Sequence, residues 1–481
     1  MPAFIDHGKR HEAGNSICMQ PAQRKSKREA KKQKIHLVSL GCAKNQVDSE
    51  VMLGRLQQAG WSITENPEEA YAIVVNTCSF IESAAEESVE TIVELAEYKK
   101  SGCCRRLVVT GCLPERYREK IIQALPEVDV FLGTAALDQI VQAVGAASFM
   151  HQVVLPDPDS ICVDAFNTPR VLSSAYMAYL KIAEGCGKTC SYCIIPKLRG
   201  SHKSRPPEDV LTEARRLVGN GIKELNLVAQ DSTSYGLDLM PPITLGGLIH
   251  DLADLSFGHG RTKEQPWVRV LYGHPESIDE TFMRSVADYP NVCSYFDVPI
   301  QHASDRILKR MGRRYTHDTL QRLFQRIRDI VPDACLRTTI ITGFPGETDT
   351  DFQKVLDLAE EIRFDHLGAF VYSDADDIPS HRLRHHVPRE VAQSRLDQLM
   401  SVQMDIASEK NQHHIGKTVQ VLIEEDLGNH LFAGRTAFQA PEVDGVVYVN
   451  IAHSGLPLPI GRFVQARITD ALEYDLMGEV A

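Results

Sequence analysis

Three cysteines near the middle of the chain, Cys186, Cys190 and Cys193, have the spacing of a loop that binds a metal cluster. They lie in the segment EGCGKTCSYCIIP, directly after an apolar run that we expect to be a strand. A closed cluster or a structural zinc site needs four ligands, so three thiolates would leave one iron of a 4Fe–4S cluster with an open position. The alternatives are a zinc site with a distant fourth ligand and three free cysteines. Because catalytic loops of βα barrels follow the strands, the pattern favours an open cluster that binds a substrate.

Cys42, Cys78 and Cys112 form a second group, which only the expected strands reveal. They follow closely on the apolar runs IHLVSL, AIVVNT and RLVVTG. In an open parallel sheet these strand ends share one edge, where ligands bind, so we expect the three thiolates to hold a second 4Fe–4S cluster with an open iron. The alternative is that each is a small apolar residue at a strand end. The other cysteines are expected to be loop or packing residues: Cys18, Cys103, Cys104, Cys162, Cys293 and Cys335.

The elements that would position both groups are strands that alternate with helix-like segments. Apolar runs at 35–40, 72–77, 106–111 and 128–133 predict a doubly wound parallel α/β domain over 35–148. A second series begins after a linker or docking loop at 151–171, which is rich in Asp and Pro. Its expected strands are 179–184, 223–229, 267–272, 294–300, 336–342 and 366–372. Six such units predict a partial (β/α)6 barrel over 172–402.

The last part of the chain has a different pattern. One helix-like stretch follows Pro388, and short alternating runs begin after Ile415. They predict a small OB-like β-barrel over 412–481, which gives an α/β multidomain protein of about three domains.

The composition is that of an ordinary globular protein without a membrane segment. Hydrophobic residues make up 43% and charged residues 24% of 481 residues. No apolar run approaches the roughly 18 residues that cross a bilayer, and the N-terminus does not resemble a secretory signal. We therefore expect a cytoplasmic protein, a compartment in which cysteine clusters more often bind metal than form disulfides. We also expect a monomer.

The net charge of −12 is unevenly distributed. Between Arg24 and Lys34 the segment RKSKREAKKQK contains seven basic residues and one acid. Such a run is typical of a disordered tail, here 1–34, and a weak contact with the ribosome is the functional alternative. The acidic remainder argues against duplex nucleic acid as the main partner and is compatible with a basic protein.

The CxxxCxxC spacing, with Tyr192 before the last cysteine, resembles the radical S-adenosylmethionine superfamily. The resemblance implies that the methionine part of S-adenosylmethionine chelates the open iron and that electron transfer yields a 5′-deoxyadenosyl radical. It places Tyr192 near the adenine. Gly343 and Gly346 in TTIITGFPGE resemble the superfamily's glycine motif, with an ordinary turn as the alternative. Gln230 and Asp231, which end VAQD, are candidates to contact the methionine part.

Longer stretches resemble the methylthiotransferases, from about Ile35 to the end of the chain. They are LVSLGCAKNQVDSEVMLG, VVNTCSFIESAAEES, VTGCLPERY, KIAEGCGKTCSYCIIPKLRG and DVPIQHASDRILKRM. The terminal module is similar to a TRAM domain. The resemblance implies that Cys42, Cys78 and Cys112 hold the second cluster and that an external electron donor is needed. It also implies two molecules of S-adenosylmethionine, one for the methyl group and one for the radical.

Two branches of this family differ in substrate. One modifies adenosine in tRNA, and the other modifies the β-carbon of an aspartate in the twelfth protein of the small ribosomal subunit. LGCAKNQVDSE, VAQDSTSYG, PIQHAS and GRTAFQAPEVDGVVYV resemble the second branch. Charge supports it independently, because residues 412–481 contain nine acids and four bases, whereas a module that grips tRNA should be basic. We therefore expect a basic ribosomal protein as substrate.

Two segments differ from the sequence expected for the family: LYGHPES at 271–277 and DADDIPSHRLRHHVP at 374–388. Both could line the substrate channel. Three other functions compete: a tRNA methylthiotransferase, a cobalamin-dependent radical methylase and a non-enzymatic iron–sulfur electron carrier that docks on ribosomes. The second would usually carry an Asp-x-His-x-x-Gly motif, which is absent from 35–144.

Overall fold

The computed structural model of the chain describes residues 33–145, 152–161, 163, 169–256, 264–451 and 459–481. Residues Gln33–Ala481 form one compact unit, and the segment Met1–Lys32, with most of the expected basic tail, lies outside the described residues. Cys18 and Cys162 also lie outside them. Lys34, expected at the end of the tail, instead begins the first strand. Within the described residues, no helix has the length and apolar character needed to cross a membrane.

The first domain is a parallel sheet of order β2-β1-β3-β4-β5-β6. Its strands are β1 (Lys34–Ser39), β2 (Ser62–Ile63), β3 (Ala72–Thr77), β4 (Arg106–Gly111), β5 (Val130–Leu132) and β6 (Gln152–Val154). The chain leaves β1 for β2 on one side and returns to β3 on the other side. The strand order therefore reverses between β1 and β3, and such a reversal opens a crevice at the carboxyl ends of the two strands.

Helices cover both faces of this sheet. Val74 and Val108 pack towards α1 (Ala43–Gln58) and α6 (Ile140–Gly145). Their neighbours Ile73 and Val75 pack towards α2 (Glu82–Ala96) and α5 (Glu119–Ala124). Successive side chains of a strand point to opposite faces, so continuous apolar runs are what a sheet buried on both faces requires. The predicted doubly wound domain is confirmed.

The second series of strands forms a partial barrel. The strands are β7 (Met177–Lys181), β10 (Glu224–Val228), β11 (Trp267–Val270), β12 (Tyr295–Asp297), β13 (Cys335–Thr342) and β14 (His366–Val371). They run parallel in this order, and an isolated bridge between Val268 and Val292 joins the β11 half to the β12 half. Each expected strand is found within a few residues of its predicted position.

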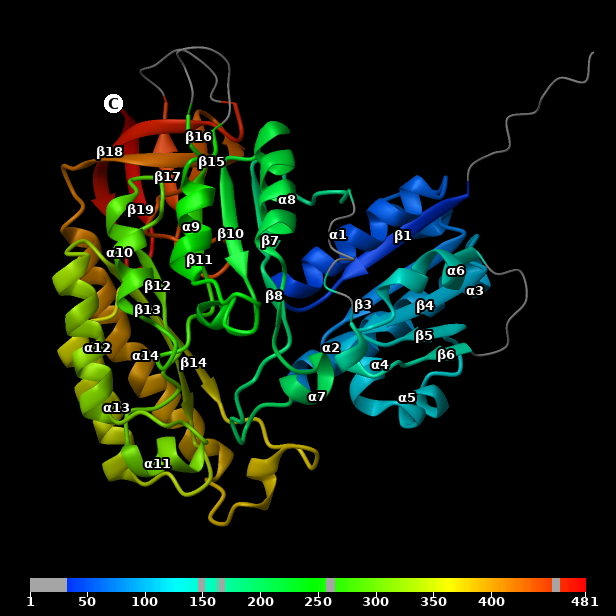
Figure 1. Ribbon diagram of the computed structural model, residues 1–481, viewed down its shortest axis with the longest axis horizontal. Helices are drawn as coiled ribbons and strands as arrows, with labels where there is room; N and C mark the ends of the chain where they lie inside the picture. The colour runs from blue at the N-terminus through cyan, green and yellow to red at the C-terminus, as the bar shows by residue number, and fades with distance from the viewer. Residues whose placement is uncertain (1–32, 146–151, 162, 164–168, 257–263, 452–458) are drawn as a thin grey trace, which may run out of the picture. The chain divides into compact units, whose positions relative to one another are not determined.

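Helices lie outside these strands (Figure 1). They are α8 (Pro207–Gly219), α9 (Leu245–Ala253), α10 (Glu280–Asp288), α11 (Asp305–Arg310), α12 (His317–Ile330) and α13 (Asp349–Ile362). Their apolar faces share one core with the strands. The short strands β8 (Ala183–Glu184) and β9 (Lys203–Ser204) pair beside the barrel, with α7 (Ile195–Arg199) between them in the sequence.

The long helix α14 (Arg389–Gln412) leads into a closed five-stranded barrel of order β15-β16-β17-β19-β18. Its strands are β15 (Thr418–Gly428), β16 (Leu431–Arg435), β17 (Val447–Asn450), β18 (Phe463–Ala471) and β19 (Leu476–Val480). The predicted β-barrel is confirmed, and closure leaves this module without a free sheet edge.

The last residue of β16 and the segment that follows it close the amino-terminal end of the partial barrel. Each of the six parallel strands contributes a side chain that bonds to residues 435–444: Tyr179, Glu224, Arg269, Tyr295, Arg337 and His366. Tyr295, for example, donates a hydrogen bond of 2.6 Å to Asp444. The terminal module is thus the floor of the barrel as well as a module in its own right.

Two strands of the first sheet were not anticipated. β2 has two residues, and β6 has three and lies in the expected linker 151–171, which also contains a short 3-10 helix, η3 (Pro158–Ser160). Strands this short carry too few residues to display alternation. The domain boundaries themselves remain predictions.

Candidate functional site

The cysteines of the first domain lie at the reversal of strand order. Cys42 caps α1 just after β1, Cys78 follows β3, and Cys112 follows β4 as the first residue of α4 (Cys112–Tyr117). Gly41 has a φ of +94°, and a Cβ there would lie 2.6 Å from the Cβ of Cys78. Only glycine tolerates both that backbone conformation and that approach. The structure therefore brings the three predicted cysteines to one edge of the sheet.

These three thiols have different electrostatic surroundings. Burial raises the pKa of Cys112 to about 12 against the opposing charge of Arg199, and burial also raises the pKa of Cys78. Cys42 is exposed; desolvation by the surrounding protein favours its neutral thiol, but the charges of Lys44 and Arg199 outweigh this effect and the pKa lies below its ordinary value. Because iron binds the thiolate, metal binding would have to offset the burial of Cys112 and would need little help at Cys42.

The second cysteine group lies on the loop between β8 and α7. The Cys186 amide donates to the Gly200 carbonyl at 3.1 Å, and the Cys193 amide donates to the Cys190 carbonyl at 3.1 Å. Burial raises the pKa of Cys193 to about 12, and the neighbouring charges of Cys190 and Cys186 add to it. The three cysteines therefore share one short loop between β8 and α7, and their role as cluster ligands remains a prediction.

Gln230 and Asp231, expected to contact S-adenosylmethionine, lie at the end of β10 next to this loop. The Gln230 amide donates to Glu184 at 2.6 Å, and its Oε1 is buried without a hydrogen-bond partner among the described residues. Asp231 is buried and accepts hydrogen bonds from Thr233 and Ser234. A buried acceptor without a partner is costly, which makes Gln230 a place where a ligand could complete a hydrogen bond.

Tyr192, the third expected contact, is held by an arginine that the sequence did not single out. Its hydroxyl accepts from Arg313 Nη2 at 2.5 Å and from Nε at 3.1 Å. Arg313 also donates to His274 Nε2. The hydroxyl end of Tyr192 is thus occupied by protein, which leaves its ring as the part that could face a ligand.

Gly343 and Gly346 each have a sufficient reason to be glycine without a cofactor. Gly343 has a φ of +75°, and a Cβ there would lie 2.2 Å from the Ala392 Cβ on α14. Gly346 has a φ of +88°, and a Cβ would lie 3.1 Å from the Arg310 guanidinium. Both positions are explained by packing, and a role for either in cofactor binding remains a prediction.

The two cysteine groups are joined by apolar packing. Cys112 packs in one buried cluster with Ile194, the neighbour of Cys193, and with Leu198 and Ile378. The cluster therefore contains a cysteine of the first domain and a residue adjacent to a cysteine of the second.

A buried network of charges reinforces this contact. Lys181 of β7 binds Asp48 of α1 and Glu184, the latter at 2.7 Å. Arg199 of α7 binds the same two carboxylates at 2.7 and 3.4 Å. Sequence patterns missed this network because Asp48 belongs to the first domain whereas Lys181, Glu184 and Arg199 belong to the second, and nothing in local spacing couples the two sides.

The two segments that differ in sequence from the family, 271–277 and 374–388, lie next to the cysteine groups. Lys44, two residues after Cys42, places its ammonium 3.4 Å from the centre of the Tyr272 ring, and Tyr272 has a φ of +63°. The Ser380 amide donates to the Ser191 carbonyl at 2.8 Å, within the second cysteine loop. A strained non-glycine residue packed against a site is a common feature of functional regions.

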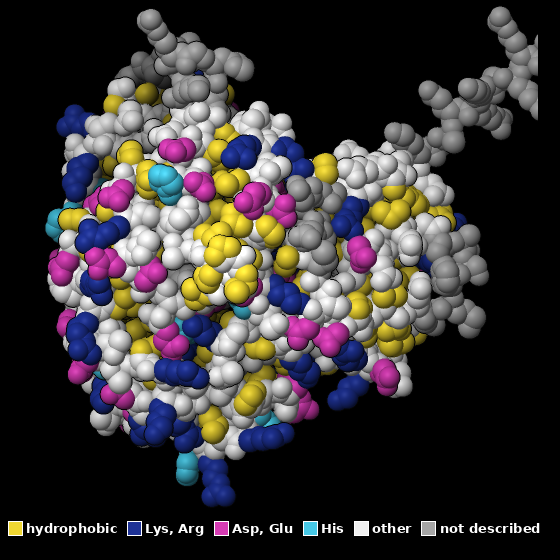
Figure 2. Space-filling view, in the orientation of Figure 1, with side chains coloured by type: hydrophobic (Ala, Val, Ile, Leu, Met, Phe, Trp, Pro, Cys, Tyr) yellow, Lys and Arg dark blue, Asp and Glu magenta, His cyan; other side chains and the backbone are white. Residues whose placement is uncertain are grey.

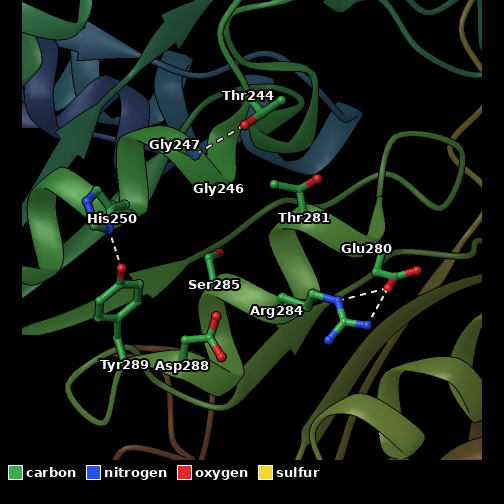
Figure 3. Close-up of a pocket in the computed structure, with 10 residues that line it drawn as sticks. All are labelled: Thr244, Gly246, Gly247, His250, Glu280, Thr281, Arg284, Ser285, Asp288 and Tyr289. Atoms are coloured by element: carbon green, nitrogen blue, oxygen red, sulfur yellow. Dashed lines mark hydrogen bonds and ion pairs between the residues drawn. The ribbon is translucent and has the colours of Figure 1, made fainter.

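The other candidate sites among the described residues lack the chemistry of the two cysteine groups. No group of three or more His, Cys, Asp or Glu side chains within the described ranges is arranged around a single ion. A 4Fe–4S cluster does not require that, because each thiolate binds a different iron. A hollow of about 470 Å³ between α9 and α10 is lined by His250, Glu280 and Tyr289 among others (Figure 3), and none of its lining residues is a cysteine.

Some acidic residues of the terminal module are internal. Glu424 binds Arg435, Glu442 accepts from Tyr179, and Asp444 accepts from Tyr295. Without Glu424, Glu442, Asp444 and Arg435, residues 412–481 contain six acids and three bases. The acidic excess therefore persists but is smaller than in the sequence count. Figure 2 shows acidic and basic side chains interspersed over the upper part of the visible face.

Comparison with known proteins matches three consecutive parts of the chain. Residues 34–133 match a family described as uncharacterized protein family UPF0004, residues 180–359 match the radical SAM superfamily, and residues 415–481 match the TRAM domain. Among solved structures, the radical S-adenosylmethionine methyltransferase TsrM from Kitasatospora setae covers 73% of this chain and 75% of its own, with a TM-score of 0.52 and 13% identity. At that identity the likeness concerns the fold alone.

Relatives of known name extend over nearly the whole chain. A protein of Desulfosudis oleivorans named ribosomal protein uS12 methylthiotransferase RimO is 50% identical over 447 residues, which are 93% of this chain and 99% of that protein. A protein of the same name from Clostridioides difficile is 47% identical and covers 93% of this chain and 98% of its own. The resemblance to methylthiotransferases, and to their protein-modifying branch, is therefore confirmed. This chain belongs to the RimO family of ribosomal protein uS12 methylthiotransferases, which are radical SAM transferases.

Proposed function

We propose that this protein adds a methylthio group to the β-carbon of an aspartate in the twelfth protein of the small ribosomal subunit. The observation that carries the proposal is the packing of Cys112 with Ile194, which places a cysteine of one open group against the loop of the other. A carbon–hydrogen bond without an acidifying neighbour does not yield to a side-chain base near neutral pH, so a radical is the appropriate tool. The names of the relatives support uS12 as the substrate.

The residues at the two sites fit two 4Fe–4S clusters and S-adenosylmethionine. Cys186, Cys190 and Cys193 would hold one cluster, and Cys42, Cys78 and Cys112 would hold the other. Each set supplies only thiol ligands, which suits iron–sulfur clusters, and each is one ligand short of closure. The unpartnered Gln230 Oε1 suits an ammonium donor such as that of S-adenosylmethionine. When bound, these groups supply a 5′-deoxyadenosyl radical and a sulfur atom that can be methylated.

The protein's own contribution is to position the groups and exclude water. Ile194, Leu198 and Ile378 cover Cys112 with apolar surface. Arg313 fixes Tyr192 by two hydrogen bonds, so the aromatic ring keeps one orientation. No side chain near the cysteines is needed as a general base, because hydrogen is removed as an atom.

We further propose that two molecules of S-adenosylmethionine are consumed for each product and that an external donor supplies electrons. The reconstituted protein, reductant, S-adenosylmethionine and substrate should give one 5′-deoxyadenosine and one S-adenosylhomocysteine for each methylthio group. Chromatographic quantification of both products tests this ratio. Formation of 5′-deoxyadenosine alone, with no modified substrate, would contradict the transferase proposal, and absence of both would favour an electron carrier.

The substrate is tested by competition between the two branches of the family. The reduced protein is incubated with uS12 and, in parallel, with tRNA, and each is analysed by mass spectrometry for a methylthio addition. We expect uS12 to be modified at one aspartate and tRNA to be unchanged. Modified tRNA with unmodified uS12 would reverse the choice of substrate. Modification of a ribosomal protein would place the reaction in the cytoplasm, where the basic tail could contact the ribosome.

The second cluster is tested by its iron. Wild-type protein should bind about eight irons per chain, and Cys42→Ala about four, if a cluster with three ligands needs all of them. Cys103→Ala is a matched control, because Cys103 is an exposed cysteine of the same domain. About four irons in both wild type and Cys42→Ala would remove the second cluster and most of the proposed chemistry.

A further inference from the structure

We infer that Arg199 is a positioning residue for the first-domain cysteines and that, with Gly200, it fixes their separation from the second cysteine group. Arg199 belongs to α7, six residues after Cys193, yet its side chain reaches into the other domain. The inference deepens the proposed function and rests on it, because it concerns how the two proposed clusters are held.

The guanidinium of Arg199 is buried, and both of its terminal nitrogens have partners. Its side chain is 2% exposed, Nη2 lies 3.8 Å from the Cys112 Sγ, and Nη1 lies 2.7 Å from Asp48. The same guanidinium binds the Asn45 side-chain oxygen. The planar fork of arginine can direct donors to several acceptors at once, which the single ammonium of lysine cannot match.

Asn45 connects Arg199 to the backbone next to the other two cysteines, Cys42 and Cys78. Its amide nitrogen donates to the Leu40 carbonyl at 2.9 Å and to the Thr77 carbonyl at 2.9 Å. Leu40 precedes Gly41 and Cys42, and Thr77 immediately precedes Cys78. Arg199 therefore contacts one cysteine directly and, through one amide, the backbone that carries the other two.

The next residue contacts the other group. The Gly200 carbonyl accepts from the Cys186 amide at 3.1 Å, and Gly200 has a φ of +74°, a conformation that side chains rarely adopt. Two consecutive residues thus bind one cysteine of each group. A rigid link between the groups is what transfer between two sites requires, since small displacements of reacting groups lower rates strongly.

Arg199 should affect the first-domain cluster through its charge as well as by positioning the cysteines. A guanidinium stays protonated in proteins, and a cation beside a buried cluster favours the more negative, reduced form. Asp48 and Glu184 offset part of this charge, but Nη2 still donates towards the thiol. Removing the guanidinium should therefore make the reduction potential of that cluster more negative and weaken its hold on iron.

The test uses the full chain with Arg199→Gln and Arg199→Lys, reconstituted anaerobically. Potentials of the first-domain cluster are measured by electron paramagnetic resonance in a background with Cys186, Cys190 and Cys193 all changed to Ala. We expect Arg199→Gln either to lose this cluster, with iron falling from about eight to about four in the otherwise unchanged chain, or to shift its potential to a more negative value. Arg199→Lys should lie between Arg199→Gln and wild type.

Ser173→Ala provides the control. The Ser173 hydroxyl donates to Glu50 of α1 at 2.7 Å, a hydrogen bond that joins the same two domains and involves none of the residues placed at the cysteine groups. It should leave iron content and potential unchanged, as should Arg199→Gln for the other cluster in a Cys42→Ala background. Equal iron and equal potential in Arg199→Gln and wild type would overturn the inference, and if Arg199→Gln does not fold, the same result in Arg199→Lys would overturn it. A wild type with only about four irons would overturn the proposed second cluster and this inference together.

Discussion

At the scale of single residues, Tyr192 depends on a buried pair that local sequence does not reveal. His274 accepts from Arg313, which in turn binds the Tyr192 hydroxyl. Burial lowers the pKa of His274 to about 2, and the charges of Arg313 and Lys188 act in the same direction. A neutral histidine is required here, because only the neutral ring can accept a hydrogen bond from a cation.

This lowered pKa predicts a dependence of stability on pH. Below the ordinary histidine value of 6.5 the unfolded chain binds a proton that the folded His274 does not, so the contribution is present above pH 6.5 and is lost as pH falls. Between pH 7.5 and pH 5.5 this costs about 1.4 kcal/mol. His274→Gln keeps an acceptor that does not titrate, so its free energy of unfolding should fall less over that range. Denaturant titrations at both pH values measure it, and equal losses in the two proteins would contradict the assignment.

At the scale of elements, the cysteine loop after β8 is held by close backbone packing. Gly185 has a φ of +75°, and a Cβ there would lie 2.0 Å from the Ser201 carbonyl oxygen. On the far side of the loop the Ser191 amide donates to the Met311 carbonyl at 2.9 Å. The loop is thus held at Gly185 and at Ser191. These two contacts restrict the movement of the CxxxCxxC segment and so keep its three thiols together.

Gly185→Ala should therefore cost iron and not merely stability. The added methyl group would collide with backbone, so the loop would have to move and displace Cys186. We expect iron per chain to fall by about four, the content of one cluster. Gly221→Ala is the matched control: its φ is +100° but nothing lies within 4 Å of the added carbon, so it should cost only the conformational penalty of about 1–2 kcal/mol. Iron analysis of both variants decides, and full iron in Gly185→Ala would show that the loop yields.

At the scale of the whole molecule, the terminal module is attached through buried charges. Arg435 binds Glu224 of β10 at 2.6 Å and Glu424 of β15, and Arg269 binds Glu224 at 2.9 Å. All six barrel strands contact the segment 435–444, so the module and the barrel share this floor. A loosely tethered substrate-binding module would not need such contacts, and we expect the two to unfold together.

Arg435→Ala tests this coupling. It would leave Glu224 and Glu424 short of their shared cation, and breaking a buried pair typically costs about 3–5 kcal/mol. We expect a large fall in the free energy of unfolding, detected as a lower denaturant midpoint for the barrel as well as the terminal module. Arg462→Ala, an exposed arginine of the same module, should change stability by no more than about 0.5 kcal/mol. A separate early transition of the terminal module alone would indicate an independent unit.

The sequence by itself determined the fold class and the two cysteine groups. Apolar runs such as 72–77 and 106–111 mark strands buried on both faces, and the register of a cysteine relative to a strand end is a local property. Charge in 412–481 pointed correctly to the protein-modifying branch, although Glu442 and Asp444 turn out to serve the barrel floor. The short strands β2 and β6 were not predicted, because two or three residues are too few to show the alternation of apolar and polar side chains.

Only the tertiary structure decided how the two groups are held relative to each other. Arg199 lies 87 residues from Cys112 and 154 from Asn45 in the chain, and His274 lies 39 from Arg313. Patterns of period 2 or 3.6 describe neighbours within one element, whereas these contacts depend on which faces of two domains meet. The three thiols of each group could therefore be identified from the sequence. The Arg199 guanidinium that links the two groups could be identified only from the folded chain.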